Sequence, residues 1–139
     1  MKVLANKKKI KVGKFTFGKI VHECQNNLFI IQAEVAGANK SINEDKVKEV
    51  ENIIDTIEKI LPPIKSFFIS GGTELTASFD FARTLARRAE RRVVAVHEEK
   101  VVNVGLNSLT YLNRLSSLLY ALARLTNHKS GITEDKPRY

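Results

Sequence analysis

The residues best suited to chemistry lie in one arginine-rich segment, residues 82–94. On a helix, Arg83, Arg87 and Arg91 recur every four positions and share one face, where like charges repel by about 0.2–0.5 kcal/mol per pair. Arg88 and Arg92 are the other two arginines of the segment. Guanidinium groups are rigid forks of N–H donors that match phosphate oxygens. We therefore expect an anion, such as a polyphosphate, against this face; solvent or carboxylates of a neighbouring subunit are the alternatives.

The elements that must position these arginines follow from hydrophobic periodicity. Apolar residues recurring every three or four positions predict four helices, over residues 18–36, 41–61, 73–96 and 108–127. Ser41 and Glu44 have the spacing of a capping box at the start of the second helix, and Pro62 ends that helix. No strand is predicted. Four such helices with short links predict an all-α antiparallel helix bundle.

The last two predicted helices are expected to pack along their length. The expected inward residues of the third helix are Leu75, Phe79, Ala82, Ala86, Ala89 and Val93. Those of the fourth are Leu109, Leu112, Leu115, Leu119 and Leu122. Because the small residues of the third helix lie opposite its arginines, they should allow a close approach of the two helices.

The composition of the 139-residue chain predicts a single domain over residues 1–139. Residues 1–15 are predicted to form a basic irregular arm, and residues 129–139 a frayed polar tail. The sequence has no apolar run of membrane-spanning length and no signal-peptide pattern. The single cysteine, Cys24, is expected to be a core residue in a reducing, cytoplasmic setting. His22, His97 and His128 lack metal-ligand spacing, so no metal site is predicted.

The formal net charge is +8, and net charge alone is a weak indicator of a partner. Lysines at positions 7, 8, 9, 11 and 14 contribute part of it. A basic chain can bind nucleic acid, but no zinc finger, basic heptad region or aromatic RNP-like strand accompanies the charge. A basic helical module that binds nucleic acid or another protein therefore stays as the alternative, and it requires lysines and arginines spread over one continuous face.

Three motifs of the second half resemble the PduO-type ATP:cob(I)alamin adenosyltransferases. Residues 67–72, Phe-Phe-Ile-Ser-Gly-Gly, resemble the family's Phe-Ile-Leu-Pro-Gly-Gly loop. Residues 82–94 resemble its Ala-Arg-Thr-x-x-Arg-Arg-Ala-Glu-Arg-x-Val-Val helix, and residues 111–116 its Tyr-Leu-Asn-Arg-Leu-Ser signature. With a weaker match over residues 24–36, the resemblance covers about residues 20–128.

The resemblance implies a fold, an assembly and a reaction. Members are five-helix bundles that form homotrimers, with active sites between the subunits. They bind ATP with Mg2+ and take reduced cobalamin as substrate. The Co(I) centre attacks the 5′ carbon of ATP and the triphosphate leaves, which gives adenosylcobalamin.

The resemblance also implies roles for individual residues. Five residues would form the ATP-binding set: Arg87, Arg88, Glu90, Arg91 and Asn113. Arg83 would pair with an aspartate across the subunit interface, and it joins Arg87 and Phe67 in the expected catalytic set. Phe67 and Tyr120 would form the cobalamin pocket. There the Phe67 ring would crowd the lower face of the corrin, and loss of the lower ligand would make the cobalt easier to reduce.

The N-terminal part departs from the family pattern. A Thr-Gly-Asp-x-Gly-Thr phosphate loop and a helix with an Asp-Glu-Leu-Asn motif are both unmatched, as is the aspartate expected to pair with Arg83. Two smaller departures are Ser70, which replaces the loop proline, and Asp80, which stands where a histidine is common. Three explanations remain open: a chain given without all its residues, a truncated gene, or a catalytically impaired homologue.

Overall fold

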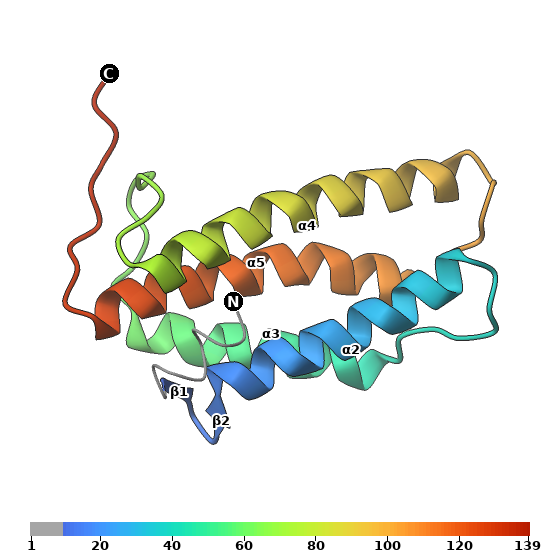
Figure 1. Cartoon of the computed structure of the whole chain (residues 1–139), viewed down its shortest axis with the longest axis horizontal. Coiled ribbons are helices and arrows are strands. Elements are labelled where there is room, and N and C mark those ends of the chain that lie inside the picture. Colours follow the sequence, from blue (N-terminus) through green and yellow to red (C-terminus); the bar gives the residue numbers. More distant parts are fainter. Residues whose placement is uncertain (1–9) are drawn as a thin grey trace.

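The computed structural model describes residues 10–139 and shows a bundle of four long helices with a small hairpin at one end (Figure 1). The elements are β1 (Lys11–Val12), β2 (Phe15–Thr16), α2 (Phe17–Val35), α3 (Glu44–Ile60), α4 (Glu74–Glu98) and α5 (Leu106–Lys129). Consecutive helices run in opposite directions. The all-α antiparallel bundle predicted from periodicity is therefore confirmed.

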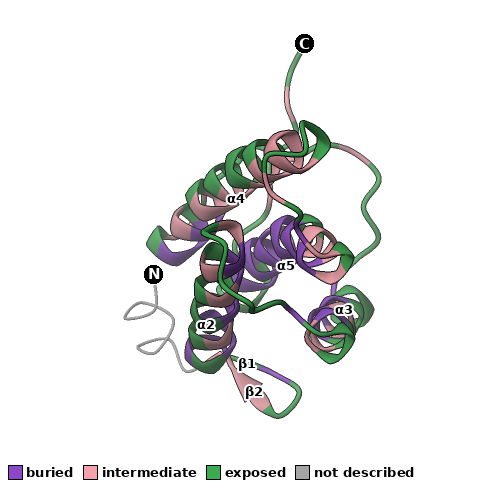
Figure 2. Cartoon of the chain, turned by 90° about the vertical axis from the view of Figure 1, so that its right-hand side faces the viewer, coloured by how far each residue is buried: buried purple, intermediate pink, exposed green. Residues whose placement is uncertain are grey.

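Helix α5 is the centre of the bundle. It packs along α4 and against α3, and α2 completes the ring around it (Figure 2). Its inward side chains include Tyr111, Leu118, Leu122 and Leu125, all fully buried. The α4 residues Leu75 and Phe79 face them as expected. Residue Leu109, also expected inside, is only half-buried, although its neighbour Ser108 is fully buried.

The helix starts follow ordinary capping chemistry, with one correction to the sequence prediction. The side chains of Thr16, Asn43 and Thr73 accept hydrogen bonds from backbone amides three residues on. The predicted Ser41–Glu44 capping box was wrong, because α3 begins at Glu44 and Asn43 caps it. The reason lies at Ile42. Its side chain is buried and its amide donates to the Ser108 hydroxyl, and these contacts hold the segment before Asn43 against α5 outside the helix.

A β-hairpin precedes α2, where the sequence predicted an irregular basic arm and no strand. Val12 pairs with Phe15 and Lys11 with Thr16, and Gly13 supplies the positive φ that the tight turn requires. Val12 is buried, so its burial on α3 gives the hairpin a reason to form. The irregular arm predicted over residues 1–15 is therefore wrong over residues 11–15. The lysines at positions 7–9 lie outside the described residues.

The other end of the chain also differs from expectation. The tail after α5 was predicted to be frayed, but it is held against the rest of the molecule. The Ile69 amide donates a hydrogen bond to the Asp135 carbonyl over 2.8 Å. Arg124 donates to Glu134 over 3.1 Å, and both side chains are largely buried. Buried charges need partners, so this ion pair anchors the tail.

Polar side chains in the core are paired across the helices. Asn27 of α2 donates to the Tyr111 hydroxyl of α5 over 3.1 Å. Glu34 at the end of α2 accepts from the Gly105 amide and the Ser108 hydroxyl, at 2.7 Å and 2.5 Å. Cys24 is a free, buried thiol, as expected, and burial raises its pKa to about 11. The bonds of Asn27 and Glu34 join the C-terminal half of α2 to the start of α5.

A cavity of about 270 Å³ lies between α2, α4 and α5. Its lining is almost entirely apolar and includes Leu28, Leu85, Ala86 and Ala89. The expected burial of Ala89 is therefore wrong: it is exposed and lines this cavity. None of the helices among residues 10–139 is long and apolar enough to cross a membrane.

Candidate functional site

The arginine row predicted from the sequence lies on the outer face of α4. Arg87, Arg88 and Arg91 are exposed, and no carboxylate among residues 10–139 forms an ion pair with them. They recur along almost one and a half turns of a 25-residue helix. Three unpaired guanidinium groups on a rigid element form a donor surface suited to an anion that carries several oxygens.

Asn113 on α5 reaches this row through Glu90 of α4. Its amide nitrogen donates to the Glu90 carboxylate over 2.9 Å. Its amide oxygen accepts from Arg114 over 3.2 Å, and Arg114 also donates to Glu51 of α3 over 3.0 Å. The structure thus brings Glu90 and Asn113 together. The bonds to Glu90 and Arg114 hold the Asn113 amide in one orientation, since they engage its two ends differently.

Sequence reasoning missed Arg114 and Glu51 as contributors to this network. Arg114 is part of the Asn-Arg-Leu-Ser run and directly follows Asn113, so a signal was available. Glu51 carried none, because it lies 63 positions away in an amphipathic helix with many acidic residues. Only the packing of α3 on α5 makes it a neighbour.

Arg83 stands apart from the exposed row, one turn closer to the start of α4. It is half-buried, and its guanidinium carbon lies 5.3 Å from the centre of the Tyr120 ring. A cation over an aromatic face is stabilised by the ring quadrupole. Its Nε atom is buried without a hydrogen-bond partner among the described residues. The structure therefore brings Arg83 and Tyr120 together and leaves one Arg83 donor unsatisfied.

The loop of residues 67–72 is fixed at its glycine end. The Gly71 amide donates to Asp80 over 2.8 Å, and the Gly71 carbonyl accepts from Asn127 over 2.9 Å. The Asn127 amide oxygen in turn accepts from Thr76 over 2.8 Å. Both glycines of the pair have φ above +100°, which side chains disfavour. The Gly-Gly motif is thus needed for this turn.

Phe67 projects from the other end of this loop. Its ring is 77% exposed, whereas the adjacent Phe68 lies beneath the Arg124 guanidinium, 5.1 Å from it. Tyr120 instead lines a cavity of about 40 Å³ with Phe68, Asp80 and Arg83. Phe67 does not line this cavity. The structure therefore does not bring the two predicted pocket aromatics, Phe67 and Tyr120, into one cavity of the single chain.

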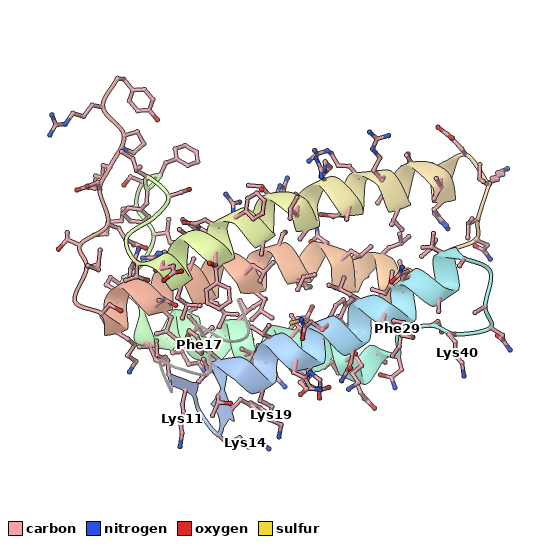
Figure 3. All side chains as sticks on the ribbon, in the orientation of Figure 1. Lys11, Lys14, Phe17, Lys19, Phe29 and Lys40 are labelled. Atoms are coloured by element: carbon pink, nitrogen blue, oxygen red, sulfur yellow. The ribbon has the colours of Figure 1, made fainter. Side chains whose placement is uncertain are left out.

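The lysines around the hairpin and the arginines of α4 are two separate groups of positive charge among the described residues. Lys11, Lys14 and Lys19 point outward around the hairpin and the start of α2, while Phe17 points into the bundle (Figure 3). The arginine row lies on α4, across the bundle from the hairpin.

The structure shows no metal centre among the described residues: within residues 10–139 no group of three or more His, Cys, Asp or Glu side chains is placed to hold an ion.

Comparisons with known proteins give a consistent result. The sequence model of the cobalamin adenosyltransferase family matches residues 3–126. The corrinoid adenosyltransferase PduO of Citrobacter freundii is 38% identical over 117 residues, which are 79% of this chain and 34% of that protein. The corrinoid adenosyltransferase of Bacillus subtilis is 36% identical over 110 residues, 79% of this chain and 54% of that protein. The chain thus spans between a third and about half of the length of these relatives.

Solved structures agree. A variant of the PduO-type ATP:corrinoid adenosyltransferase from Lactobacillus reuteri, in complex with cobalamin and ATP, superimposes with a TM-score of 0.84 at 27% identity. The superposition covers 99% of this chain and 79% of that chain. A second variant of that enzyme, in complex with ATP, gives a TM-score of 0.81 at 27% identity. Fold, motifs and sequence agree, and the chain belongs to the cobalamin adenosyltransferase family.

Proposed function

We propose that this chain transfers the 5′-deoxyadenosyl group of ATP to reduced cobalamin. The proposal rests on the unpaired arginine row of α4, together with the membership of this chain in the family. The Lactobacillus reuteri relative with the same fold was solved with cobalamin and ATP together. In the proposed reaction the Co(I) lone pair attacks C5′ of ATP, a Co–C bond forms, and the C5′–O bond breaks. The triphosphate leaves with the bonding electron pair.

The α4 arginines suit the charge that this step develops. Arg87, Arg88 and Arg91 would hold the phosphate oxygens before and after the bond breaks. Because a helix fixes them in advance, they would stabilise the leaving group without rearrangement of solvent. Asn113, oriented by Glu90 and Arg114, would contact the nucleotide. Magnesium would enter with the ATP phosphates, since the described residues offer no cluster of carboxylates for it.

The corrinoid would lie at the exposed loop that carries Phe67. There the ring would cover the lower face of the cobalt and exclude the lower ligand. The cavity beside Tyr120 measures about 40 Å³, far too little for a corrin ring. A neighbouring subunit would complete the corrinoid surface in an active site shared between subunits.

We propose a homotrimer for the same reason. The exposed arginines, the exposed Phe67 and the unsatisfied Arg83 Nε lie on or beside α4, where a neighbouring copy would supply acceptors. Light scattering should give a mass near three times the 15.6 kDa of the chain. A monomer at micromolar concentration would contradict the trimer. The free Cys24 supports a reducing, cytoplasmic location.

One assay tests the proposed function directly. Chemically reduced Co(I) cobalamin and MgATP are incubated with the protein, and adenosylcobalamin is identified by its light-sensitive Co–C bond. Formation of the product with release of triphosphate is the expected result. Binding of ATP without any product would identify an impaired homologue. The hairpin lysines and the α4 arginines lie on opposite sides of the bundle, which speaks against the alternative of a nucleic-acid module, because such a module needs one continuous basic face.

A further inference from the structure

The tail after α5 lies against the loop that carries Phe67, and two contacts hold it there, one to the loop and one to α5. The Ile69 amide of the loop donates to the Asp135 carbonyl of the tail over 2.8 Å. One residue earlier in the tail, Glu134 accepts from Arg124 of α5 over 3.1 Å. The Arg124 and Glu134 side chains are only 8% and 15% exposed. The tail is thus held at Glu134 and Asp135.

Arg124 connects the two segments. Its guanidinium bonds to Glu134 in the tail and also lies over the Phe68 ring in the loop, 5.1 Å from the ring centre. Because both charges are largely desolvated, neither tolerates the loss of the other. If the pair is broken, the tail loses its anchor, and Ile69 loses a fixed acceptor for its amide. The two loop residues that follow Phe67 would both be released.

The rest of the loop does not compensate for that loss. The bonds from Asp80 and Asn127 act at Gly71, four residues beyond Phe67. The Phe67 ring itself is exposed and has little packing of its own. Its direction therefore depends on how Phe68 and Ile69 are held.

We propose that the Arg124–Glu134 ion pair positions the Phe67 ring, by clamping the tail onto the loop. The inference rests on the proposed function, in which Phe67 covers the lower face of the corrinoid cobalt. Arg124 and Glu134 are positioning residues and do not touch the reacting atoms. The alternative is that the pair only stabilises the end of the chain.

The experiment compares two starting materials. Adenosylation is measured from Co(I) prepared with a chemical reductant, and from Co(II) with a dihydroflavin as one-electron donor. The variants are Glu134→Gln, Arg124→Gln and the double variant. Glu58→Gln on the exposed face of α3 removes the same charge elsewhere and serves as control. Hydrogen exchange at the Ile69 amide reports directly on the tail–loop contact, and circular dichroism reports on the fold.

We expect Glu134→Gln to speed exchange at Ile69 while the amides of α5 stay protected. The rate from Co(II) should fall between about tenfold and a hundredfold, because small misplacements of a positioning group have effects of that size. The rate from Co(I) should stay at the wild-type value. The double variant should be no worse than the worse single variant, since both remove one interaction. Arg124→Lys, which keeps the charge, should recover part of the Co(II) rate.

Three outcomes would overturn the inference. In the first, exchange at Ile69 is unchanged in Glu134→Gln. In the second, both rates fall equally in a folded variant, which assigns the pair to general stability. In the third, the wild type is active from Co(I) and the variants keep the wild-type ratio of the two rates. A wild type that fails to adenosylate Co(I) instead refutes the proposed function itself. If Arg124→Gln does not fold, the milder variant Glu134→Gln alone decides the test.

Discussion

Asp80 on α4 accepts a hydrogen bond from the backbone amide of Gly71 over 2.8 Å. This bond joins the start of the arginine helix to the glycine turn of the exposed loop. It also explains how an acidic residue is accommodated where the family commonly has histidine. The carboxylate bonds to the loop backbone, and bonds from an amide to a charged acceptor are stronger than neutral ones.

Replacing Asp80 by Ala should release the glycine turn. The variant leaves the Gly71 amide without its acceptor, so the free energy of unfolding should fall by about 1–2 kcal/mol. Asp80→Asn keeps an oxygen at the same place and should lose less. Asp55→Ala, at an exposed position of α3, should be nearly neutral. Urea unfolding of the four proteins provides the comparison, and equal stability of Asp80→Ala and Asp55→Ala would show that the bond contributes nothing.

Removing single arginines of α4 should weaken ATP binding. Each of Arg87→Ala and Arg91→Ala removes a charge-assisted phosphate contact, which contributes about 1.5–3 kcal/mol. The dissociation constant should therefore rise by roughly ten- to a hundredfold. Arg92→Ala removes the same side chain from an exposed position outside the proposed ATP set and is the control. Isothermal titration calorimetry giving the same shift for all three variants would exclude a specific role for the row.

Gly72→Ala should destabilise the loop more than glycine replacement does elsewhere. The added methyl group would collide with the Asn127 side chain, and the φ of Gly72 is +131°. We expect a loss of about 2–4 kcal/mol in the free energy of unfolding, from backbone strain and overpacking together. Gly13→Ala has a positive φ but no atom within 4 Å of the new methyl group. Its cost should stay near the strain contribution of about 1 kcal/mol. Similar losses in both variants would mean that Asn127 moves aside freely.

Sequence patterns were sufficient for the long helices because their signals are local. The stripe containing Leu75 and Phe79 on α4, and that containing Leu112 and Leu122 on α5, each identify a buried face at helical spacing. The start of α3 could not be chosen from the sequence alone. Ser41 and Asn43 are both good caps, and the burial of Ile42 decides between them. That burial depends on contacts with α5, which no local pattern encodes.

The hairpin and the tail anchor were missed for a related reason. The strands have two residues each, too few for an alternating pattern to be recognised in a lysine-rich stretch. Arg124 lies within the apolar stripe of α5, and its partner Glu134 lies in a tail of ordinary polar composition. Neither residue has a motif. In the candidate site, the Asn113–Glu90 bond joins two motifs visible in the sequence, whereas Glu51 became a contributor only through helix packing.

The buried thiol of Cys24 should make stability depend on alkaline pH. Burial raises the pKa of the folded form to about 11 from the ordinary 9.0, while the thiol of the unfolded chain keeps the ordinary value. Below pH 9.0 both forms hold the proton and the thiol adds no pH dependence. Between pH 9.0 and about 11 only the unfolded form ionises, so the free energy of unfolding should fall, by about 2–3 kcal/mol in total.

Comparison with Cys24→Ala separates this effect from that of other groups. Burial also raises the pKa of Tyr111, which adds its own decline at higher pH. The difference in free energy of unfolding between wild type and Cys24→Ala should be constant up to about pH 9 and should shrink above it. Urea titrations at pH 8, 9, 10 and 11 measure it. A difference that stays constant over the whole range would mean that the folded protein ionises this thiol as readily as the unfolded chain.

The last prediction concerns Phe67 and uses a second exposed phenylalanine as its control. Phe67 and Phe29 are 77% and 71% exposed. Phe29 lies in the C-terminal half of α2 (Figure 3). Neither Phe67→Ala nor Phe29→Ala removes a buried contact, so both should stay within about 0.5 kcal/mol of wild-type stability. Both should also bind ATP normally, because neither ring supplies a donor for phosphate.

The two variants should separate in their corrinoid chemistry. Phe67→Ala should sharply slow adenosylation that begins from Co(II), where exclusion of the lower ligand makes reduction easier. It should have less effect when Co(I) is supplied, because that form already lacks the lower ligand. The absorption spectrum of Co(II) bound with ATP should lose its four-coordinate component in Phe67→Ala and keep it in Phe29→Ala. If Phe67→Ala slows both routes equally while the four-coordinate component remains, the ring orients the substrate and does not displace its ligand.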